Sequence, residues 1–383
     1  MSTQLKSKVK KMNIIDKLYQ EFTINAIKNT NWKKGTQNPL IVELDPTAIC
    51  DLACPGCISE DIIATGNSFT NKRLLELGEE FKNNGVKGVI LIGGGEPLAH
   101  PAIGELIEYF GKNDISVGIT TNGTFIHKYM NEIAQYSHWT RISIDAASEK
   151  IFEILRPTKG GGSKFNHIIQ NMRELAKIKK GKLGFSFLIR SEIEDDNIVS
   201  NIHEIYAAAK LAKDIGCDYF EVKPSYNYKD DVAHSLVQYP DKQIAEIKEE
   251  LVKLESLVTK NFSIVKAITL DESLNGTHKK QVKEYHFCPS TQLRTLLTPV
   301  GTFVCPYWRG KNDFNIGDAK TTNFKDLWTG KQRQDVEKWL DPSIHCASLH
   351  CLRHETNLEI IKIMDDITNN KDIKIIENFD RFI

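Results

Sequence analysis

Three cysteines within eight residues carry the clearest chemical signal in this sequence. They are Cys50, Cys54 and Cys57, spaced C-x3-C-x2-C, and they follow an apolar run at 39–44 that is typical of a buried strand. Thiolates are the preferred ligands of iron–sulfur clusters. A cubane with four irons takes four ligands, so three cysteines leave one iron open, much as a catalytic zinc keeps one position open. The spacing therefore predicts a [4Fe-4S] cluster that can bind a small chelating cofactor.

Other kinds of cysteine site have different sequence patterns. A structural zinc site uses two paired clusters of Cys or His, each with a spacing near C-x2-4-C. A redox dithiol is a lone C-x-x-C pair, and inert buried cysteines show no local grouping. The close grouping of three cysteines favours the iron–sulfur cluster over these alternatives.

The same loop, placed after a first strand, resembles the signature of the radical S-adenosylmethionine (SAM) superfamily. The resemblance implies that SAM binds the open iron through its amino and carboxylate groups. It also implies that an electron from the cluster cleaves SAM to methionine and a 5′-deoxyadenosyl radical, which takes a hydrogen atom from the substrate. An electron donor such as a flavodoxin or ferredoxin is then needed. One residue departs from the family pattern, because Gly56 stands where an aromatic side chain usually lies near the adenine.

The composition is that of an ordinary globular protein. Hydrophobic residues make up 40% of the 383 residues, enough for one large domain and a smaller one. Lys+Arg and Asp+Glu each number 50, and this balance argues against a general binder of nucleic acid or anionic membranes. The sequence has no apolar run of 18 residues, and its basic start lacks the apolar core of a secretory signal. We therefore expect a cytoplasmic protein, in which exposed thiols stay reduced.

Short apolar runs alternate with amphipathic helical patterns between residues 38 and 230. This alternation predicts an α/β fold whose parallel strands are joined by right-handed crossovers. Six such units resemble the partial (β/α)6, TIM-like barrel of radical SAM enzymes. The expected strands are 40–44, 88–92, 116–120, 140–144, 183–189 and 219–222, and the expected helices include 74–81, 103–110, 165–178 and 198–215.

Composition also divides the chain into segments. The predicted segments are an N-terminal helical extension (1–37), the barrel (38–230), a charged helical linker (231–285), a small C-terminal domain rich in Cys, His and aromatic residues (286–356), and a helical tail (357–383). An extension of 37 polar residues is too short to build a separate peptide-binding module.

A glycine-rich turn follows the second predicted strand. It reads Gly93-Gly94-Gly95-Glu96-Pro97, and its glycines let the backbone pass close to a ligand. The turn lacks the Lys-Ser/Thr of a phosphate-binding loop and the G-x-G-x-x-G of a dinucleotide fold. In this position it resembles the GGE motif, which implies that Gly94, Gly95 and Glu96 hold the amino group of SAM. A purely structural turn is the alternative.

Further polar residues stand at the later strand ends, where parallel sheets carry their chemistry. Ser143 and Asp145 share a face, because side chains alternate along a strand. The resemblance implies that Asn122 lines the SAM pocket and that Ser143 lies near the carboxylate or ribose of SAM. It also implies that Arg156 pairs with that carboxylate in a bidentate manner, and Arg190 is a candidate of the same kind. An arginine that caps a helix end is the alternative for Arg156.

The sixth predicted strand places residues at both ends of the barrel. Lys223 and Tyr226 follow it on the active side and are the candidate catalytic or substrate-contacting residues, together with Ser225. Cys217 stands six residues before Lys223, about 20 Å away at roughly 3.3 Å per residue. We therefore expect Cys217 to be a small buried hydrophobic residue at the barrel bottom.

A second set of four cysteines lies in the C-terminal region. Cys288 and Cys305 flank a predicted hairpin at 294–305, and Cys346 and Cys351 follow as a C-x4-C pair. The pattern resembles the SPASM or shorter twitch extensions of radical SAM enzymes. That resemblance implies an auxiliary [4Fe-4S] cluster with four protein ligands, whose role is electron transfer or structure. A zinc site is the alternative, and a nearby histidine could replace one cysteine as a ligand: His345, His350 or His354.

These patterns together predict a radical SAM oxidoreductase. The short N-terminal extension and the balanced charge favour a small-molecule substrate, and a sugar-like metabolite that is dehydrogenated or epimerised is the first expectation. A peptide- or protein-modifying maturase is the alternative within the family. An iron–sulfur or zinc interaction protein without catalytic activity is the alternative outside it.

Overall fold

The computed structural model describes residues 10–11, 15–32, 35, 38–194, 197–227, 235–276, 281–377 and 380–383. The described residues form an eleven-stranded sheet with the order β1-β12-β9-β6-β5-β4-β3-β2-β13-β14-β15. All strands from β1 to β13 in this order pair in parallel, and β13, β14 and β15 pair antiparallel. The strands are β1 (Lys10–Lys11), β12 (Ser263–Lys266), β9 (Tyr219–Pro224), β6 (Lys182–Ile189), β5 (Ser137–Ser143), β4 (Ser116–Thr121), β3 (Gly88–Leu91), β2 (Ile41–Leu44), β13 (Arg294–Thr298), β14 (Gly301–Phe303) and β15 (Asn315–Gly317).

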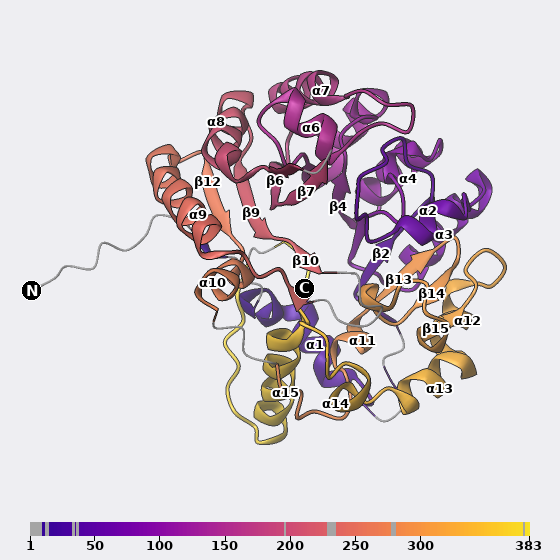
Figure 1. Ribbon diagram of the computed structural model, residues 1–383. Helices are drawn as coiled ribbons and strands as arrows, with labels where there is room; N and C mark the ends of the chain where they lie inside the picture. Colours follow the sequence, from indigo (N-terminus) through magenta and orange to yellow (C-terminus); the bar gives the residue numbers. More distant parts are fainter. Residues whose placement is uncertain are drawn as a thin grey trace, which may run out of the picture.

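The central part of the sheet confirms the predicted partial barrel. The six strands expected from the sequence are β2, β3, β4, β5, β6 and β9, and helices surround the curved sheet on its outer side (Figure 1). The helices of this part are α2 (Glu60–Ala64), α3 (Asn71–Asn83), α4 (Ile103–Lys112), α5 (Met130–Tyr136), α6 (Glu149–Leu155), α7 (Phe165–Ile178), α8 (Ile205–Ile215) and α9 (Asp241–Lys253).

Helix α7 illustrates why these segments pack as they do. Apolar residues recur every three or four positions, which gives the helix one apolar face. That face is buried against the sheet, and its members are Phe165, Ile168, Ile169, Met172 and Leu175. The strands beneath are apolar on the side that meets the helices, as expected for a covered parallel sheet.

Several strands were not predicted, among them β1 and β15 at the two edges of the sheet. The segment expected to be a helical linker contains β12, which adds a further parallel strand beside β9. It also contains α10 (Ile268–Asn275) and β11 (Ser235–Leu236), and β11 pairs with β10 (Tyr226–Asn227). The pattern at 198–215 begins with an antiparallel hairpin, β7 (Ser191–Glu194) and β8 (Asn197–Ser200), before α8 starts. Short strands of this kind show no clear spacing of hydrophobic residues. The sequence therefore predicted helix in segments that contain strands.

The C-terminal region continues the sheet of the barrel. Strand β13 lies parallel to β2, and the predicted hairpin is confirmed, with Thr298 opposite Gly301 at its turn. The helices of this region are α11 (Ser290–Leu293), α12 (Phe324–Thr329), α13 (Lys331–Trp339) and α14 (Pro342–His345). The sheet therefore crosses the segment boundaries proposed at residues 230 and 285, and these boundaries stay predictions.

The described parts of the two chain ends pack together. The short helix η1 (Ile15–Tyr19) and α1 (Glu21–Asn29) lie beside α15 (His354–Thr368), as Figure 1 shows near its lower edge. Apolar residues of all three helices share one buried cluster. The predicted N-terminal extension at 1–37 lies only partly within the described residues. No helix in the described ranges is long and apolar enough to cross a membrane.

Candidate active site

The first cysteine loop directly follows β2 at the carboxyl end of the sheet. Cys50, Cys54 and Cys57 are each half-buried and unbridged. The amide nitrogen of Asn122 lies 3.9 Å from the Cys50 sulfur, and a guanidinium nitrogen of Arg156 lies 3.8 Å from the Cys54 sulfur. Asn122, after β4, and Arg156, after α6, thus meet the cysteines that the sequence singled out.

The loop is held by the segment after α6. The Ala53 amide donates to the Pro157 carbonyl at 2.7 Å, and the Lys159 amide donates to the Asp51 carbonyl at 3.2 Å. Gly56 is exposed and has a φ of 61°, which is the left-handed region that favours glycine. This backbone turn gives a physical reason for glycine where the family pattern has an aromatic residue.

The glycine-rich turn packs directly against this loop. A Cβ on Gly95 would lie 2.5 Å from the backbone of Ala48, and a Cβ on Gly94 would lie 2.7 Å from a neighbouring side chain. The Glu96 amide donates to the Ile49 carbonyl at 2.8 Å. The close approach of the two segments therefore requires glycine at position 95, while a Cβ on Gly94 would meet the side chains of Ile62 and Asp45.

Glu96 connects the glycine-rich turn to the end of β4. Its side chain accepts hydrogen bonds from the Leu98 amide at 3.0 Å, the Thr121 hydroxyl at 2.5 Å and the Asn122 amide at 2.7 Å. Glu96 is only 2% exposed, and burial raises its pKa to about 7. A carboxylate offers about four acceptor positions, so three protein donors leave room for one ammonium group.

We expect Glu96→Ala to weaken SAM binding. Losing a charge-assisted hydrogen bond costs about 1.5–3 kcal/mol, so the dissociation constant for SAM should rise roughly ten- to a hundredfold. Isothermal titration of the anaerobic, cluster-loaded protein measures this constant. Glu105→Ala, on the exposed face of α4, is the matched control.

The Glu96 variant also leaves three donors without their acceptor, so its melting temperature must be compared with that of the wild type. Glu96→Gln keeps the size of the side chain and removes its charge. If both variants bind SAM as tightly as the wild type does, Glu96 has no role in holding the cofactor.

Asp145 and Arg156 form a buried ion pair beside the cysteine loop. Asp145 is 1% exposed and has a φ of 59°, a strained conformation of the kind that clusters at functional sites. One carboxylate oxygen accepts from two nitrogens of Arg156 at 2.9 and 2.5 Å, and the other accepts from the Leu188 amide at 2.7 Å. The third guanidinium nitrogen points to Cys54. Arg156 therefore joins the end of β5 to the cysteine loop, and its contact with the SAM carboxylate stays a prediction.

The remaining candidate cofactor contacts lie around the same loop. Arg190 donates to the carbonyl groups of Pro55 and, at 3.1 Å, Leu155. The Asn122 side chain donates to the Asp51 carboxylate at 2.9 Å. Ser143 is the last residue of β5 and stands opposite a serine of β6. Arg190 and Asn122 thus position the cysteine loop, while their contacts with SAM stay predictions.

Lys223 belongs to a charged group inside the barrel. Its ammonium lies 3.4 Å from the Glu221 carboxylate, which also lies 3.2 Å from the Arg141 guanidinium. Burial lowers the pKa of Lys223. Tyr226 is half-buried in β10, and burial raises its pKa. The roles of Lys223 and Tyr226 as catalytic residues stay predictions. Cys217, which precedes the same strand, is 4% exposed and therefore buried, as expected.

Sequence reasoning missed several residues that shape this site. Asn201 donates to the backbone of Asp145 at 2.8 Å and so supports its strained conformation. Asp45, directly after β2, is fully buried and pairs with Arg309 at 2.8 Å. Burial raises the pKa of Asp45 to about 6, although Arg309 acts in the opposite direction. Asp45 directly follows a predicted strand, so its place at the edge of the sheet could have been predicted. No motif in the sequence indicated that Arg309 would bind it.

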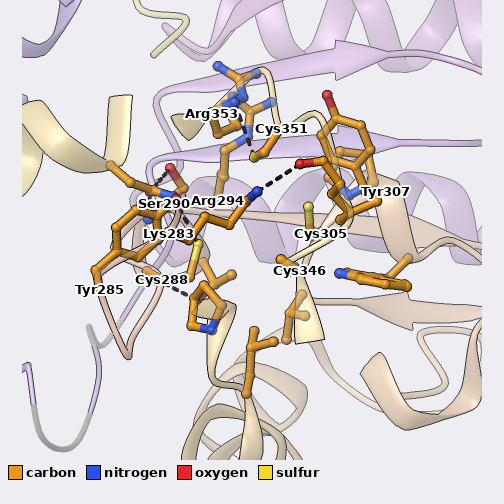
Figure 2. Close-up of a pocket in the computed structure, with 18 residues that line it drawn as sticks. Lys283, Tyr285, Cys288, Ser290, Arg294, Cys305, Tyr307, Cys346, Cys351 and Arg353 are labelled. Atoms are coloured by element: carbon orange, nitrogen blue, oxygen red, sulfur yellow. Dashed lines mark hydrogen bonds between the residues drawn. The ribbon is translucent and has the colours of Figure 1, made fainter. Parts of the chain in front are cut away.

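The second cysteine set surrounds a cavity of about 40 Å³ (Figure 2). The Asn357 amide donates to the sulfur of Cys288, and the Arg353 backbone amide donates to the sulfur of Cys351, each at 3.4 Å. The four predicted ligands all line the cavity: Cys288, Cys305, Cys346 and Cys351. The histidines suggested as substitutes are absent from its lining, within the described residues: His345, His350 and His354.

The four thiols and the space of this cavity suit an iron–sulfur cluster, and a zinc ion bound by four thiolates stays the alternative. The cavity exceeds the roughly 10–15 Å³ that one water needs and suits a larger inorganic group. In the first cysteine loop, burial raises the pKa of the Cys50 thiol to about 12.

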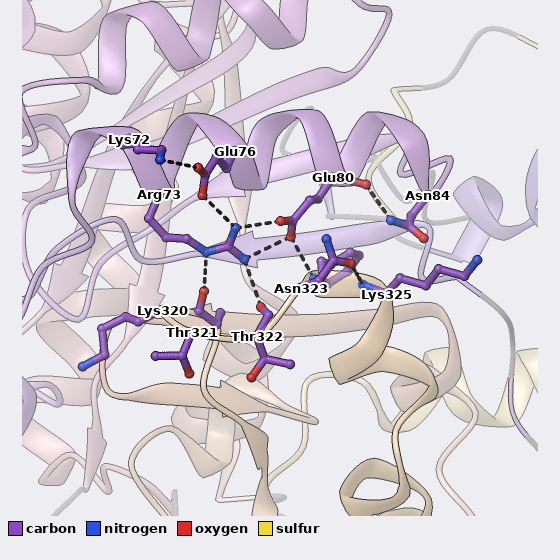
Figure 3. A network of polar contacts seen from close by, with 12 residues as sticks. Lys72, Arg73, Glu76, Glu80, Asn84, Lys320, Thr321, Thr322, Asn323 and Lys325 are labelled. Carbon is purple, nitrogen blue, oxygen red and sulfur yellow. Dashed lines mark hydrogen bonds and ion pairs between the residues drawn. The ribbon is translucent and has the colours of Figure 1, made fainter.

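A second network fixes the C-terminal region against the barrel (Figure 3). Arg73 on α3 donates to the carbonyl groups of Ala319 at 2.7 Å and Thr322 at 3.0 Å. Glu80 binds the same guanidinium at 2.6 Å and accepts from the Phe324 amide at 2.8 Å. Together with the pair Asp45–Arg309, these contacts join the C-terminal region to the barrel.

Comparison with known families agrees with this geometry. Residues 44–199 match the family model of the radical SAM superfamily. The matched segment starts at the end of β2 and includes the first cysteine loop, the glycine-rich turn and the Asp145–Arg156 pair. This matched segment, less than half of the chain, is similar to the radical SAM superfamily, and the match agrees with the family predicted from the sequence.

Curated radical SAM relatives are distant and longer than the shared region. The chain is 25% identical over 147 residues to the mycofactocin maturase MftC of Mycobacterium tuberculosis, which covers 38% of the chain and 36% of the relative. It is 25% identical over 228 residues to the antilisterial bacteriocin subtilosin biosynthesis protein AlbA of Bacillus subtilis, covering 58% and 47%. It is 26% identical over 191 residues to an AdoMet-dependent heme synthase of Methanosarcina barkeri, covering 49% and 51%. The shared region thus spans about a third to a half of each relative.

Solved structures share the fold of this chain. Streptococcus suis SuiB bound to the precursor peptide SuiA has a TM-score of 0.58 and 17% identity, and covers 82% of this chain and 70% of its own. The anSMEcpe structure with bound AdoMet has a TM-score of 0.53 and 15% identity, and covers 87% of this chain and 100% of its own. These likenesses confirm the predicted α/β barrel architecture.

Proposed function

We propose that this chain is an enzyme that cleaves SAM reductively and takes a hydrogen atom from a peptide substrate. Cys50, Cys54 and Cys57 would hold a [4Fe-4S] cluster. When bound, this cluster supplies the electron that splits SAM into methionine and a 5′-deoxyadenosyl radical. The observation that carries the proposal is the meeting of the cysteine loop with the glycine-rich turn and Arg156 at one edge of the sheet.

The residues of the chain would each perform a physical task at this edge. Glu96 would accept the SAM ammonium at its remaining acceptor position, next to backbone that only glycine permits. Arg156 would keep a positive charge beside Cys54, and its pairing with Asp145 fixes its orientation. Arg190 would hold the loop by its bond to the Pro55 carbonyl. Preorganised groups of this kind hold a cofactor without reorganisation when it binds.

The second cysteine set would hold an auxiliary [4Fe-4S] cluster. Four protein ligands leave no iron open for a substrate, so electron transfer is the role that suits this site. The two N–H···S contacts at Cys288 and Cys351 support a buried redox group.

A peptide substrate has more support than the sugar-like metabolite expected from the sequence. Two of the curated relatives carry names that refer to a maturase and to bacteriocin biosynthesis, and SuiB was solved with a precursor peptide. The short N-terminal extension was the main argument against a peptide. The relatives that are named a heme synthase and a probable GTP 3′,8-cyclase keep a small molecule as the second candidate.

Deuterium transfer distinguishes the two substrate classes. Peptides encoded beside the gene would be synthesised with deuterium at Cα and Cβ, and candidate sugars with deuterium at their carbinol carbons. We expect deuterium in 5′-deoxyadenosine only with a peptide, because the radical takes the hydrogen atom directly from the carbon that is modified. Transfer from a carbinol carbon alone would contradict the peptide proposal. Zinc without iron, and no cleavage of SAM, would favour a non-catalytic protein.

A further inference from the structure

Three charged side chains meet on the inner side of the barrel. Arg141 lies on β5, and Glu221 and Lys223 lie on β9. Their chain neighbours Ile142 and Phe220 belong to the apolar core under the outer helices (Figure 1). The three charged side chains therefore point inward, because side chains alternate along a strand. One oxygen of Glu221 lies 3.2 Å from the Arg141 guanidinium and 3.4 Å from the Lys223 ammonium. These three residues are called the inner charged group below.

An aromatic layer lies beneath this group, nearer the amino ends of the strands. Trp139 on β5 and Tyr219 on β9 precede the charged residues by two positions and share their face. A Cβ on Gly118 would lie 2.2 Å from the Trp139 ring, and a Cβ on Gly184 would lie 2.0 Å from the Tyr219 ring. Phe382 packs on Trp139 with ring centroids 5.4 Å apart. We therefore expect a ligand to reach the inner charged group from the carboxyl end of the barrel.

The other carboxylates of the inner side have cations of their own. Glu43 binds Arg294, and Asp145 binds Arg156 at 2.5 Å. In the part of the chain that the structure describes, Glu221 is the carboxylate that contacts both cations of the inner charged group. The group therefore keeps an excess of one positive charge.

The two cations are more accessible than the carboxylate between them. The side chains of Arg141 and Lys223 are 25% and 26% exposed, whereas that of Glu221 is 3% exposed. Arg141 also donates to the Thr120 hydroxyl at 3.2 Å. Guanidinium and ammonium groups carry more N–H donors than these contacts use. A ligand thus meets cationic donors first, and Glu221 holds these donors in place.

A short series of contacts links the inner charged group to the first cysteine loop. Lys223 stands opposite Leu188 in the sheet, and the Leu188 amide donates to Asp145 at 2.7 Å. Asp145 binds Arg156, whose guanidinium lies 3.8 Å from the Cys54 sulfur. The excess positive charge therefore lies close to the place where the proposed reaction takes its hydrogen atom.

We infer that Arg141 and Lys223 bind a carboxylate of the substrate, so that the peptide carries Asp or Glu near the carbon that loses its hydrogen atom. The inference rests on the proposed function and names a feature of its substrate. An arginine presents a planar fork of donors that matches a carboxylate, and a lysine adds a point charge. The same excess charge repels a basic side chain, so the site selects between peptides in both ways.

Equilibrium dialysis of the reconstituted, SAM-bound and unreduced chain tests this inference without turnover. The probes are two pools of capped short peptides that differ at one position, which holds Glu in the first pool and Gln in the second. The wild type should retain the Glu pool about tenfold more strongly, because Gln lacks the charge of the contact. Arg141→Gln and Lys223→Met should each reduce this ratio to about two or less. Lys223→Arg should keep the ratio, as should Lys242→Met on the exposed surface of α9.

Equal retention of the two pools by the wild type would overturn the inference, and so would an unchanged ratio in both neutral variants. The dissociation constant for SAM is measured in the same variants. A rise as large as that for the Glu pool would also overturn the inference, because the cations would then serve the cofactor. Deuterium transfer from a carbinol carbon alone would overturn the proposed peptide substrate. A chain that takes deuterium from a peptide but binds both pools equally would overturn this inference alone.

Discussion

Replacing Cys54 by alanine is expected to abolish the formation of 5′-deoxyadenosine from SAM. The three cysteines of the first loop are all needed to hold a cubane with one open iron, and Cys54 is the one beside Arg156. Without its thiolate the cluster is lost and SAM has no electron source. Mass spectrometry of the dithionite-reduced protein, incubated with SAM under anaerobic conditions, measures the product. We expect a decrease of more than a hundredfold, to the background level.

Cys217→Ala is the matched control for this experiment, because Cys217 is buried in the barrel core far from the loop. Deleting a small buried group costs about 1 kcal/mol and should leave SAM cleavage intact. Circular dichroism should show a folded chain for both variants. If the Cys54 variant still cleaves SAM at the wild-type rate, the first loop does not hold the catalytic cluster.

The second large effect is expected from Cys305→Ala. Removing one of the four ligands should lower the iron content from about eight to about four per chain. Cleavage of SAM without substrate turnover should continue at a rate within severalfold of the wild type, because Cys305 is not part of the first cysteine loop. Formation of the modified product should stop, because the substrate radical loses its electron acceptor. Iron and sulfide analysis, together with product analysis, measures the three quantities.

Cys305→Ser offers a weaker ligand at the same position and should retain part of the second cluster. The comparison with alanine therefore separates the loss of a ligand from a packing defect. Unchanged iron content and turnover in Cys305→Ala would mean that this cysteine set is not a cluster site.

The barrel and the cysteine sites were open to prediction because their signals are local. Apolar runs that alternate with amphipathic helices predicted six parallel strands, all of which are present. The predicted hairpin at β13 and β14 and the strand ends after β2, β3, β4 and β5 followed from the same reasoning. Side chains at neighbouring strand ends lie close together in a parallel sheet, so Asn122 and Asp145 could be grouped before any contact was known. Arg156 follows α6, and only the family resemblance pointed to it.

Contacts between distant segments were not open to prediction in this way. The sequence contains no sign that Arg309 reaches the buried Asp45, or that Arg73 binds carbonyl groups near residue 320. The three hydrogen bonds accepted by Glu96 also depend on how two strand ends approach each other. Strand β12 was missed because four residues are too few to show a period. The class of substrate is decided by surfaces that lie outside the cofactor-binding motifs. The expectation of a sugar-like substrate therefore rested on no motif.

The most direct test of the account is the yield of SAM cleavage by the wild-type chain. The protein would be reconstituted with iron and sulfide, reduced and mixed with SAM in the absence of oxygen. We expect equal amounts of methionine and 5′-deoxyadenosine, formed only in the presence of the reductant. Intact SAM after reduction of a protein that holds its full complement of iron would contradict the account.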